Sequence, residues 1–443
     1  DQRDKIIDQK NLIVKNLDLK KNSVLHQDLE PILEMSLSHL DTIKGGLKGA
    51  PKFPMFNLYE TLIYFYNKTK DKKYLKPIDI VVEKICSKGI YDHVDGGIAR
   101  YTVDEDWIIP HFEKMLLENS LLVSTYSRAY RKLKNPLYRK VVQKSIHWIL
   151  KEMGDETTGF ASSVYSESEE QEGKYYLWTL EELNEILGNL QAERMIEQLE
   201  PINGAGRLLY LPRLNEDEQW NEFMEKNVLP QLQAFRSKRH APTIDHKRVA
   251  SLNALVIKAL IDSAIALQEK SLLEKACTMA DWMKKTYYNQ DLIHSILYPQ
   301  RADDFKKTEP VLDDFAYWAE SLLQLASYSE IIRVQSSRQF LEDAESLVEQ
   351  CSRFFSDEQR AGYFFSASNS KSPPPVRKKF WYDHSSPSGN SSFLRVFSLL
   401  HQHTKKEKWK IEEKDFSKVS KKIKEELTQD LEKAFSEKDK KKR

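Results

Sequence analysis

Apolar side chains recur along most of the chain at intervals of three and four residues, the spacing that places them on one face of an α-helix. The first clear stretch runs from Leu58 to Tyr66, and the second runs from Leu75 to Cys86 and ends at Gly89. The same spacing then predicts long helices joined in pairs by short turns. Their expected ranges are 112–132 with 137–153, 249–268 with 272–287, 312–328 with 340–355, and a further helix over 393–400. Helical hairpins are therefore expected to dominate the fold.

A short turn motif follows several of these helices. The copies are residues 155–162 and 357–364, with a fainter third copy at 289–295. Repetition of this kind is typical of a stacked or closed array of helix pairs. The acid and glycine of each copy lead into short β segments, and the aromatic content of Lys174–Thr179 predicts the clearest strand. Thr179 should then cap a helix, with Glu182 completing a capping box.

Three regions follow from this pattern. Residues 1–28 are polar with weak periodicity, so we expect a tail or connector, and the helical array should occupy residues 29–404. Residues 405–443 alternate acidic and basic side chains, which is typical of a solvated helix with a basic tail. A nucleic-acid signal is the alternative for that tail. Because the chain does not begin with Met, we expect it to be a fragment or a processed product.

Composition narrows the class of protein. Hydrophobic residues make up 40% of the 443 residues, enough for a large core, and 68 Lys+Arg against 67 Asp+Glu leave a formal charge of +1. A net charge this close to zero produces no overall electrostatic attraction to nucleic acid or to an acidic membrane. No apolar run approaches the roughly 20 residues of a membrane span. The three cysteines form no CxxC pair. We therefore expect a cytoplasmic protein with neither nucleic acid nor membrane as a partner.

Residues 89–116 concentrate polar and aromatic side chains between glycines, which is typical of a concave site. His111 follows Pro110 and is expected to open a helix, where the positive end of the helix dipole would keep the imidazole neutral. A neutral imidazole there could act as a general acid or base. The alternative is a buried histidine that hydrogen-bonds a backbone carbonyl.

Glu113 or Asp92 is the expected catalytic partner of His111. Favourable placement in a first helical turn also explains Glu113, and a turn before Gly96 equally explains Asp92. His93 lies nearby in the sequence and is a further candidate for ligand binding. A role in the same turn is the alternative.

Arg100 and Tyr101 place a fork of donors beside an aromatic face, which suits a sugar hydroxyl or a carboxylate. An ion pair of Arg100 with Asp104 is the alternative. Further along the chain, Trp178 is expected to form a stacking wall for a sugar ring.

Other predicted helix starts also carry polar side chains. In an array of hairpins, the inner helices begin around one mouth, so such starts should converge on one cavity. Taken one at a time, each of these residues could simply cap a helix. Their expected position around one cavity is what favours ligand binding. The residues are Asp245, Lys247 and Asn253, then Asp313 and Asp314, then Asp383, Ser388 and Asn390.

Motifs for metals and cofactors are missing from the sequence. It contains no HExxH, no P-loop and no dinucleotide fingerprint, and its 11 histidines are scattered. The acidic run 167–172 is better explained as a solvated loop than as a calcium site. We therefore predict no metal and no cofactor.

Four blocks of sequence together resemble a known family. The blocks are Gly45–Pro54, Gly89–Leu116, Glu172–Thr179 and Pro387–Ser391. They resemble the spermatogenesis-associated protein 20 family of thioredoxin-domain proteins, over most of residues 40–400. The resemblance implies an all-α fold, an (α/α)6 six-hairpin toroid similar to N-acylglucosamine 2-epimerase and to six-hairpin glycosidases, normally behind an N-terminal thioredoxin-like domain.

The chain departs from this family in three respects. The thioredoxin-like domain is missing from the sequence, so its redox role does not carry over, and a thioredoxin-like protein becomes a candidate partner. Tyr165–Ser168 replaces an Asp-Ala-Asp-Ser segment, and Leu252–Ala254 replaces Trp-Asn-Gly. Both segments are expected near the cavity, so the departures raise the chance of changed specificity or lost catalysis.

Two functions therefore remain open. The first is a carbohydrate-active enzyme, an epimerase or isomerase or a glycosidase, that binds a sugar-like ligand in the mouth of the toroid and uses His111 as acid and base. The second is a catalytically degenerate binding or scaffold module, an accessory of a thioredoxin-like partner. Fold alone does not decide between them.

Overall fold

The computed structural model describes residues 34, 36–188, 193, 200–204, 207–211, 218–289, 292–299, 308–332 and 337–417. The predicted tail 1–28 and the residues beyond 417 lie outside this part of the chain. The chain divides into two compact units. The larger unit is Leu37–Thr308 with Ser327–Ser337, and the smaller unit contains, among the described residues, 309–326 and 338–417. This division falls inside the range 29–404 predicted as one toroid, whose boundaries stay a prediction.

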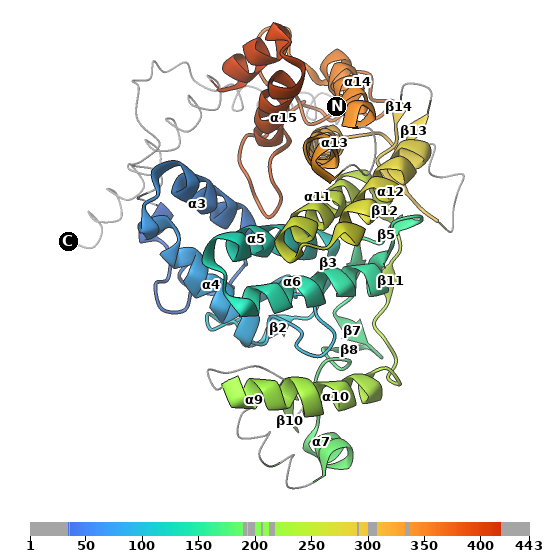
Figure 1. Ribbon diagram of the computed structural model, residues 1–443. Coiled ribbons are helices and arrows are strands. Elements are labelled where there is room, and N and C mark those ends of the chain that lie inside the picture. Colours follow the sequence, from blue (N-terminus) through green and yellow to red (C-terminus); the bar gives the residue numbers. More distant parts are fainter. Residues whose placement is uncertain are drawn as a thin grey trace, which may run out of the picture. The chain divides into compact units, whose positions relative to one another are not determined.

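Long antiparallel helix pairs build the larger unit, as the hydrophobic spacing predicts (Figure 1). The pairs are α5 (Leu116–Leu133) with α6 (Pro136–Trp148) and α11 (Ala250–Leu267) with α12 (Lys270–Tyr287). α3 (Phe56–Thr69) and α4 (Lys76–Ser87) precede them, and α4 packs against α6. α5 packs against α11, α6 and α3. At the turn between α5 and α6, Asn135 accepts a hydrogen bond from the Leu137 N–H and Pro136 is the first helical residue, a favoured way to begin a helix.

The burial of α11 on nearly all sides explains why its sequence is mostly apolar. Sixteen of its 18 residues are buried, whereas α12 buries one face only. By length and composition α11 could cross a membrane, contrary to the expectation that no run comes close, yet most of it is buried inside the protein. The core helix of a soluble fold has the same properties, so α11 is weak evidence for a membrane span.

Shorter helices separate α6 from α11 in sequence. They are η2 (Ile149–Met153), α7 (Leu180–Leu187), α9 (Glu218–Phe223), η3 (Met224–Val228) and α10 (Leu229–Arg236), and η1 (Lys72–Tyr74) precedes α4. The predicted capping box of α7 is confirmed: the Thr179 N–H donates to Glu182 Oε2 at 2.9 Å, and the Glu182 N–H donates to Thr179 Oγ1 at 3.2 Å. The strand predicted at Lys174–Thr179 is instead mostly a turn, because the Tyr176 and Leu177 N–H groups both donate to the Gly173 carbonyl.

The smaller unit contains most of α13 (Leu312–Ile332) and of α14 (Ser337–Phe355) and all of α15 (Gly389–Thr404), and residues 407–417 are helical. These elements confirm the helices predicted over 312–328, 340–355 and 393–400. The predicted charged helix from residue 405 is present as far as residue 417, and its remainder lies outside the described residues.

Short antiparallel strands precede the inner helices. β3 (Lys114–Met115), β6 (Ser163–Val164) and β11 (Ile244–Asp245) form a sheet of order β11-β6-β3, so the residues before α5 and those before α11 share one sheet. β1 (Tyr101–Thr102) pairs with β2 (Pro110–His111), and Tyr101 lies opposite His111. The other strand pairs are β4 (Gly154–Asp155) with β5 (Gly159–Phe160), β7 (Glu167–Ser168) with β8 (Gln171–Glu172), β9 (Glu200–Gly204) with β10 (Arg207–Leu211), β12 (Arg248–Val249) with β15 (Ile296–Leu297), and β13 (Tyr288–Asn289) with β14 (Leu292–Ile293).

A repeated aspartate turn confirms the internal repeat predicted at 155–162 and 357–364. In the copy that starts at Asp92, the Asp92 N–H donates to the Gly97 carbonyl at 3.0 Å, and the Gly96 N–H donates to the Asp92 carbonyl at 2.8 Å. Asp41 makes the same two bonds with Gly46 and Gly45 at 2.8 and 3.0 Å. In every copy the aspartate side chain also accepts backbone N–H groups of its own turn, which fixes the reversal. The turns begin at Asp41, Asp92, Asp155 and Asp357.

Each of these turns closes on a glycine that packs against a tryptophan. Gly159 has φ +80°, and a Cβ there would lie 2.1 Å from the Trp282 ring; Gly97 has φ +81° and would meet Trp148 at 2.9 Å. A side chain is therefore excluded both by backbone conformation and by space. The corresponding pairs in the other two turns are Gly46 with Trp107 and Gly362 with Trp381.

An asparagine from the following inner helix clamps three of the turns. Asn253 Oδ1 accepts the Phe160 N–H at 2.8 Å, and its Nδ2 donates to the carbonyls of Phe160 and Val249 at 3.1 and 2.9 Å. Asn119 does the same for Ile98. The third clamp is Asn390, which bonds both backbone groups of Tyr363. Each clamped repeat thus consists of an aspartate turn, a glycine that packs against a tryptophan, and a helix asparagine whose amide bonds the main chain of the turn.

Candidate functional site

The polar residues of the 89–116 block lie in turns, short strands and the segments between them, not at a helix start. Pro110–His111 forms β2, and α5 begins only at Leu116. The prediction that His111 opens a helix is therefore wrong: its backbone belongs to the β1–β2 pair, and the next residues join the sheet through β3. The helix dipole consequently gives no reason for a neutral imidazole at this position.

His111 lies between two carboxylates. Its Nδ1 is 2.7 Å from Glu172 Oε1, and its Nε2 is 3.8 Å from Glu113 Oε2. The Tyr101 ring stacks on the imidazole with the centroids 5.1 Å apart and the planes 24° from parallel. The His111 side chain is 29% exposed, so a ligand can reach it. Glu113 is the partner the sequence predicts; Glu172, 61 residues away in the chain, lies in the run described above as a solvated loop.

Arg100 belongs to the same group of side chains. Its guanidinium is 3.5 Å from Glu113 Oε2, and 43% of the side chain is exposed. The alternative pairing with Asp104 is not formed, because the Asp104 carboxylate accepts the N–H groups of Asp106, Ile108 and Ile109 at 2.6 to 3.1 Å. Arg100 and Tyr101 therefore both border His111, as predicted.

Glu118, in the first turn of α5, was not predicted as a site residue. It is only 5% exposed, and its Oε2 has no hydrogen-bond partner among the described residues. Burial raises the pKa of Glu118 to about 7; Arg100 acts to lower it and Glu113 to raise it, so both charges lie close by. The only sequence signal was an acid at the third position of an otherwise apolar helix start.

One face of the three-stranded sheet carries polar side chains toward His111. Lys114 pairs with Val164 in antiparallel register, so Glu113, just before β3, lies beside the end of β6 that Tyr165 follows. On the β11 side, the Tyr165 N–H donates to the Thr243 carbonyl at 2.9 Å. Because side chains alternate between the two faces of a strand, Glu113 and Tyr165 point away from the buried Lys114. Asp245, opposite Ser163, shares their face and forms an ion pair with Lys247.

Asp92 lies on the opposite face of β3 from Glu113, where the Lys114 side chain meets it. The carboxylate receives Lys114 Nζ and an Arg236 NH1 donor, each at 2.8 Å. Arg236 also bonds Asp95 at 2.9 Å. Burial raises the pKa of Asp92, but the charges of Arg236 and Lys114 outweigh it and hold the pKa well below its usual range. Asp92 therefore has the turn-forming role that was the alternative, and the structure does not bring it to His111.

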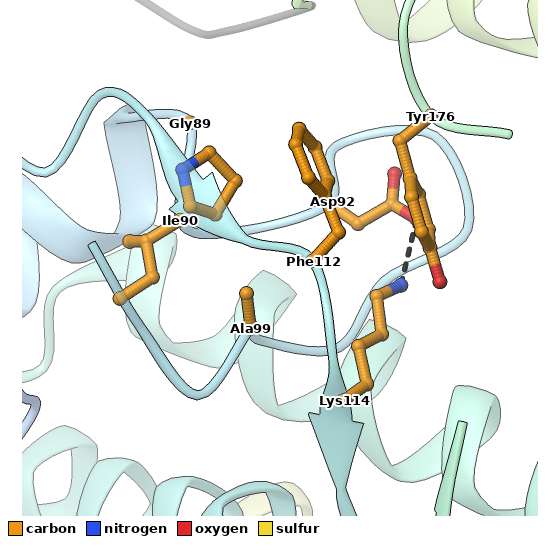
Figure 2. A pocket seen from close by; sticks show the side chains of 8 residues that line it. Gly89, Ile90, Asp92, Ala99, Phe112, Lys114 and Tyr176 are labelled. Atoms are coloured by element: carbon orange, nitrogen blue, oxygen red, sulfur yellow. Dashed lines mark hydrogen bonds and ion pairs between the residues drawn. The ribbon is translucent and has the colours of Figure 1, made fainter. Parts of the chain in front are cut away.

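A small pocket adjoins this ion cluster. Figure 2 shows the Lys114 ammonium reaching the Asp92 carboxylate, with the Tyr176 ring beside it. Phe112, Ile90 and Ala99 supply an apolar wall. The cavity measures about 20 Å³, which suits a water molecule and excludes a sugar ring. We therefore place no substrate there.

Several other predicted ligand-binding residues are buried in structural roles. His93 is 2% exposed, its Nε2 is 3.1 Å from the Lys88 carbonyl, and burial lowers its pKa to about 4. Trp178 is fully buried under the Arg239 guanidinium, 3.9 Å from the ring centroid, so the prediction of a stacking wall is wrong. Asn253 and Asn390 are fully buried and use their amides on the main chain, so the prediction that they bind ligand is also wrong.

The remaining predicted residues gather within the smaller unit. Asp314 accepts the Val311 N–H at 2.9 Å, and Asp383 accepts the Ser388 N–H at 2.8 Å. Ser388 caps α15, its Oγ accepting the Ser391 N–H. Burial raises the pKa of Asp313 to about 7, with Asp314 and Asp383 acting in the same direction and the Gly389 N–H acting against them. Their predicted convergence on the mouth that holds His111 stays a prediction.

The described residues contain no group of three or more His, Cys, Asp or Glu side chains able to hold a metal ion. The three cysteines are buried and free, and burial raises the pKa of the Cys277 thiol to about 11. None of these thiols is poised as a nucleophile.

No protein-family model matches the chain. Spermatogenesis-associated protein 20 of Mus musculus is 25% identical over 417 residues, 82% of this chain and 51% of that protein. The human protein of the same name is 24% identical over 416 residues, 82% of this chain and 52% of its own length. Over most of its length, the chain is therefore similar to spermatogenesis-associated protein 20. It spans about half the length of these curated relatives.

Solved structures of sugar-processing enzymes share the fold. A D-mannose isomerase superposes with a TM-score of 0.57 at 12% identity, over 90% of this chain and 88% of that one. A sugar epimerase from a ruminal bacterium gives 0.57 at 12% identity, over 88% and 83% of the two chains. The cellobiose 2-epimerase of Bacillus thermoamylovorans gives 0.56 at 10% identity, over 87% and 82%. The predicted fold class, an all-α (α/α)6 toroid, is confirmed; identity this low carries the fold alone.

Proposed function

We propose that this homologue of spermatogenesis-associated protein 20 binds a sugar over the polar sheet face beside α5 and moves a proton on it, as an aldose isomerase or epimerase. One observation carries the proposal: His111 lies between Glu113 and Glu172 in a partly open site. The D-mannose isomerase and the two epimerases that share the fold are named for this class of reaction. Their names support the choice of substrate class and reaction.

Glu172 would orient the imidazole. A carboxylate only accepts hydrogen bonds, so the 2.7 Å contact places the ring proton on Nδ1 and leaves the lone pair on Nε2. Nε2 then faces the side of the site that contains Glu113 and Arg100. A base fixed in this way is ready to accept a proton from carbon.

In the proposed reaction, Nε2 of His111 takes the proton from C2 of an open-chain aldose. The C–H electron pair forms the C1–C2 double bond, and the carbonyl electrons move to O1, where the exposed Arg100 guanidinium can stabilise the negative charge. Transfer of the O2 proton to O1 and return of the carbon-bound proton to C1 re-form the carbonyl at C2 and yield a ketose. Return of the proton to the other face of C2, with the O1 electrons re-forming the C1 carbonyl, yields the epimer. Glu113 is placed to exchange protons with the sugar hydroxyls.

Deuterium exchange tests the proposal. Incubation with D-mannose, D-glucose or cellobiose in D2O should introduce deuterium at C2, which NMR detects. His111→Gln should slow the exchange by about 100-fold or more, the usual loss when a general base is removed. His147→Gln, exposed on α6, is the matched control and should exchange at the native rate.

A non-catalytic binding module is the second candidate. Tyr165–Ser168 replaces the Asp-Ala-Asp-Ser segment of the family that this chain resembles, and Tyr165 directly follows β6, the strand that pairs with β3 next to Glu113. A chain of this kind would bind sugar without exchange, as an accessory of a thioredoxin-like partner. Sugar binding by the native protein with no deuterium uptake would favour this candidate over the isomerase.

A further inference from the structure

Two tyrosines are exposed where the chain approaches α11, although large aromatic side chains usually bury most of their surface. Tyr165 is 48% exposed and Tyr298 is 37% exposed. Tyr165 directly follows β6, and Tyr298 directly follows β15, the partner of the strand that leads into α11. Each strand holds its tyrosine at a defined position.

Lys247 connects these two tyrosines. Arg248 lies opposite Leu297, so Lys247 comes opposite Tyr298 in the β12–β15 pair. The Lys247 ammonium forms an ion pair with Asp245 that raises the pKa of Lys247, and Tyr298 and Tyr165 act in the same direction, so both lie near the ammonium. Two exposed aromatic rings thus lie near a fixed pair of hydrogen-bonding groups, a combination that suits a sugar ring with its apolar faces and polar rim.

This group continues the site that contains His111. Tyr165 directly follows β6, the strand that pairs with β3 next to Glu113, and Asp245 lies opposite Ser163 on the other side of β6. A second ring bonded to a sugar at His111 would therefore lie along the same face.

Charge limits the class of ligand. The face carries three carboxylates, on Glu113, Glu172 and Asp245, and two cationic side chains, on Arg100 and Lys247. Both cations are already paired with carboxylates, so the excess is negative. Such a face repels phosphorylated sugars and uronic acids and accepts an uncharged sugar.

We propose that Tyr165, Tyr298 and the Asp245–Lys247 pair form a second sugar-ring site, and that the ligand is an uncharged oligosaccharide of at least two rings with its reducing end at His111. The reducing end must lie there because only that ring opens to a carbonyl. This inference rests on the proposed function for the position of the first ring.

Binding of matched sugars to the full chain tests the second ring site. Calorimetric titration should compare D-glucose with cellobiose and D-mannose with mannobiose. In the native protein, one of the disaccharides should bind about tenfold more tightly than its monosaccharide, the gain expected from one stacked ring. In the double variant Tyr165→Ala, Tyr298→Ala this advantage should fall to about twofold or less, while monosaccharide affinity stays within about twofold.

Two controls keep the outcome clear. Tyr165→Phe with Tyr298→Phe retains the rings and should retain most of the preference, and Tyr64→Ala removes a tyrosine on α3 that is 61% exposed and should change nothing. Equal affinities of the native protein for one and two rings, or equal losses of both in the alanine variant, would overturn the second site. Tighter binding of glucose 6-phosphate than of glucose would overturn the charge argument.

Failure of the two proposals can be told apart. A tyrosine-dependent disaccharide preference without C2 deuterium exchange would leave the second ring site standing and remove the isomerase. Exchange on monosaccharides without such a preference would do the reverse. Absence of binding for every sugar tested would overturn both.

Discussion

Glu118 is a carboxyl group whose protonation the fold controls. It lies 5% exposed in the first turn of α5, close to the charges of Arg100 and Glu113. An acid with a raised folded pKa binds its proton more tightly when folded than when unfolded. Stability should therefore fall as pH rises from the ordinary value of 4.5 to about 7, and level off above that.

Glu118→Gln should remove this pH dependence, because the amide resembles the protonated acid. Raising the pKa from 4.5 to about 7 corresponds to roughly 3 kcal/mol in the free energy of unfolding. The variant should therefore be more stable than the native protein at pH 8, and the two should be about equally stable at pH 4.5. Urea denaturation at both pH values measures the difference. Glu185→Gln, exposed on α7, is the control. If the free energy of unfolding of Glu118→Gln changed with pH as it does in the native protein, Glu118 would not be the group responsible.

Asp92 is expected to stabilise the folded protein and to take no part in catalysis. Asp92→Ala would leave Lys114 and Arg236 buried with only Asp95 as a charged partner of Arg236, and we expect a loss of about 3–5 kcal/mol in the free energy of unfolding. Because the folded pKa of Asp92 is depressed, its contribution is present above the unfolded pKa and is lost as pH falls below it.

Asp106→Ala is the matched control for Asp92. It removes an exposed carboxylate paired with Lys44 at 3.1 Å and should cost less than about 1 kcal/mol. Unchanged stability in Asp92→Ala together with lost C2 exchange would instead restore the catalytic role predicted from the sequence.

At the scale of elements, the asparagine clamp connects each inner helix to the turn before it. Asn119 lies four residues after the last residue before α5, and Asn253 lies in the same position on α11. Both amides hold a turn whose glycine packs on a tryptophan. The clamp explains why such residues recur at helix starts without any ligand.

Asn253→Ala should destabilise the protein by about 3 kcal/mol, because it leaves the buried N–H and carbonyl of Phe160 without their partner. Chemical denaturation measures the loss. Asn227→Ala, which removes one exposed bond to the Phe223 carbonyl, should lie within about 0.5 kcal/mol of the native protein. A stable Asn253→Ala variant with weaker sugar affinity would contradict the clamp and support ligand binding.

At the scale of the whole molecule, the homology and the shared fold agree with the helical hairpins that the sequence predicts. Relatives at 24–25% identity extend over 82% of the chain, and the sugar isomerase and epimerases superpose over 87–90% of it. The proposed function assigns the chemistry to side chains on and beside the short strands that precede α5 and α11. In that proposal the helices supply the framework, and the residues at the strands bind the ligand.

The elements that could be predicted are those governed by neighbouring residues. The three-to-four spacing gave the long helices, and the Thr179–Glu182 capping box depends on residues three apart. His111, Glu113, Arg100 and Tyr101 were predicted as one site because they occur within a short block. The start of α5 was misplaced, because pairing with distant strands kept residues 110–115 extended.

The sequence by itself determined the helical hairpins, the repeated turns and the segment that contains His111, because local spacing sets helix faces and turn chemistry. Only the tertiary structure decided which side chains meet there. Glu172 reaches His111 across 61 residues, Arg236 reaches Asp92 across 144, and β3 brings Lys114 opposite Val164. These contacts depend on strand pairing and packing between distant segments, which no local pattern encodes.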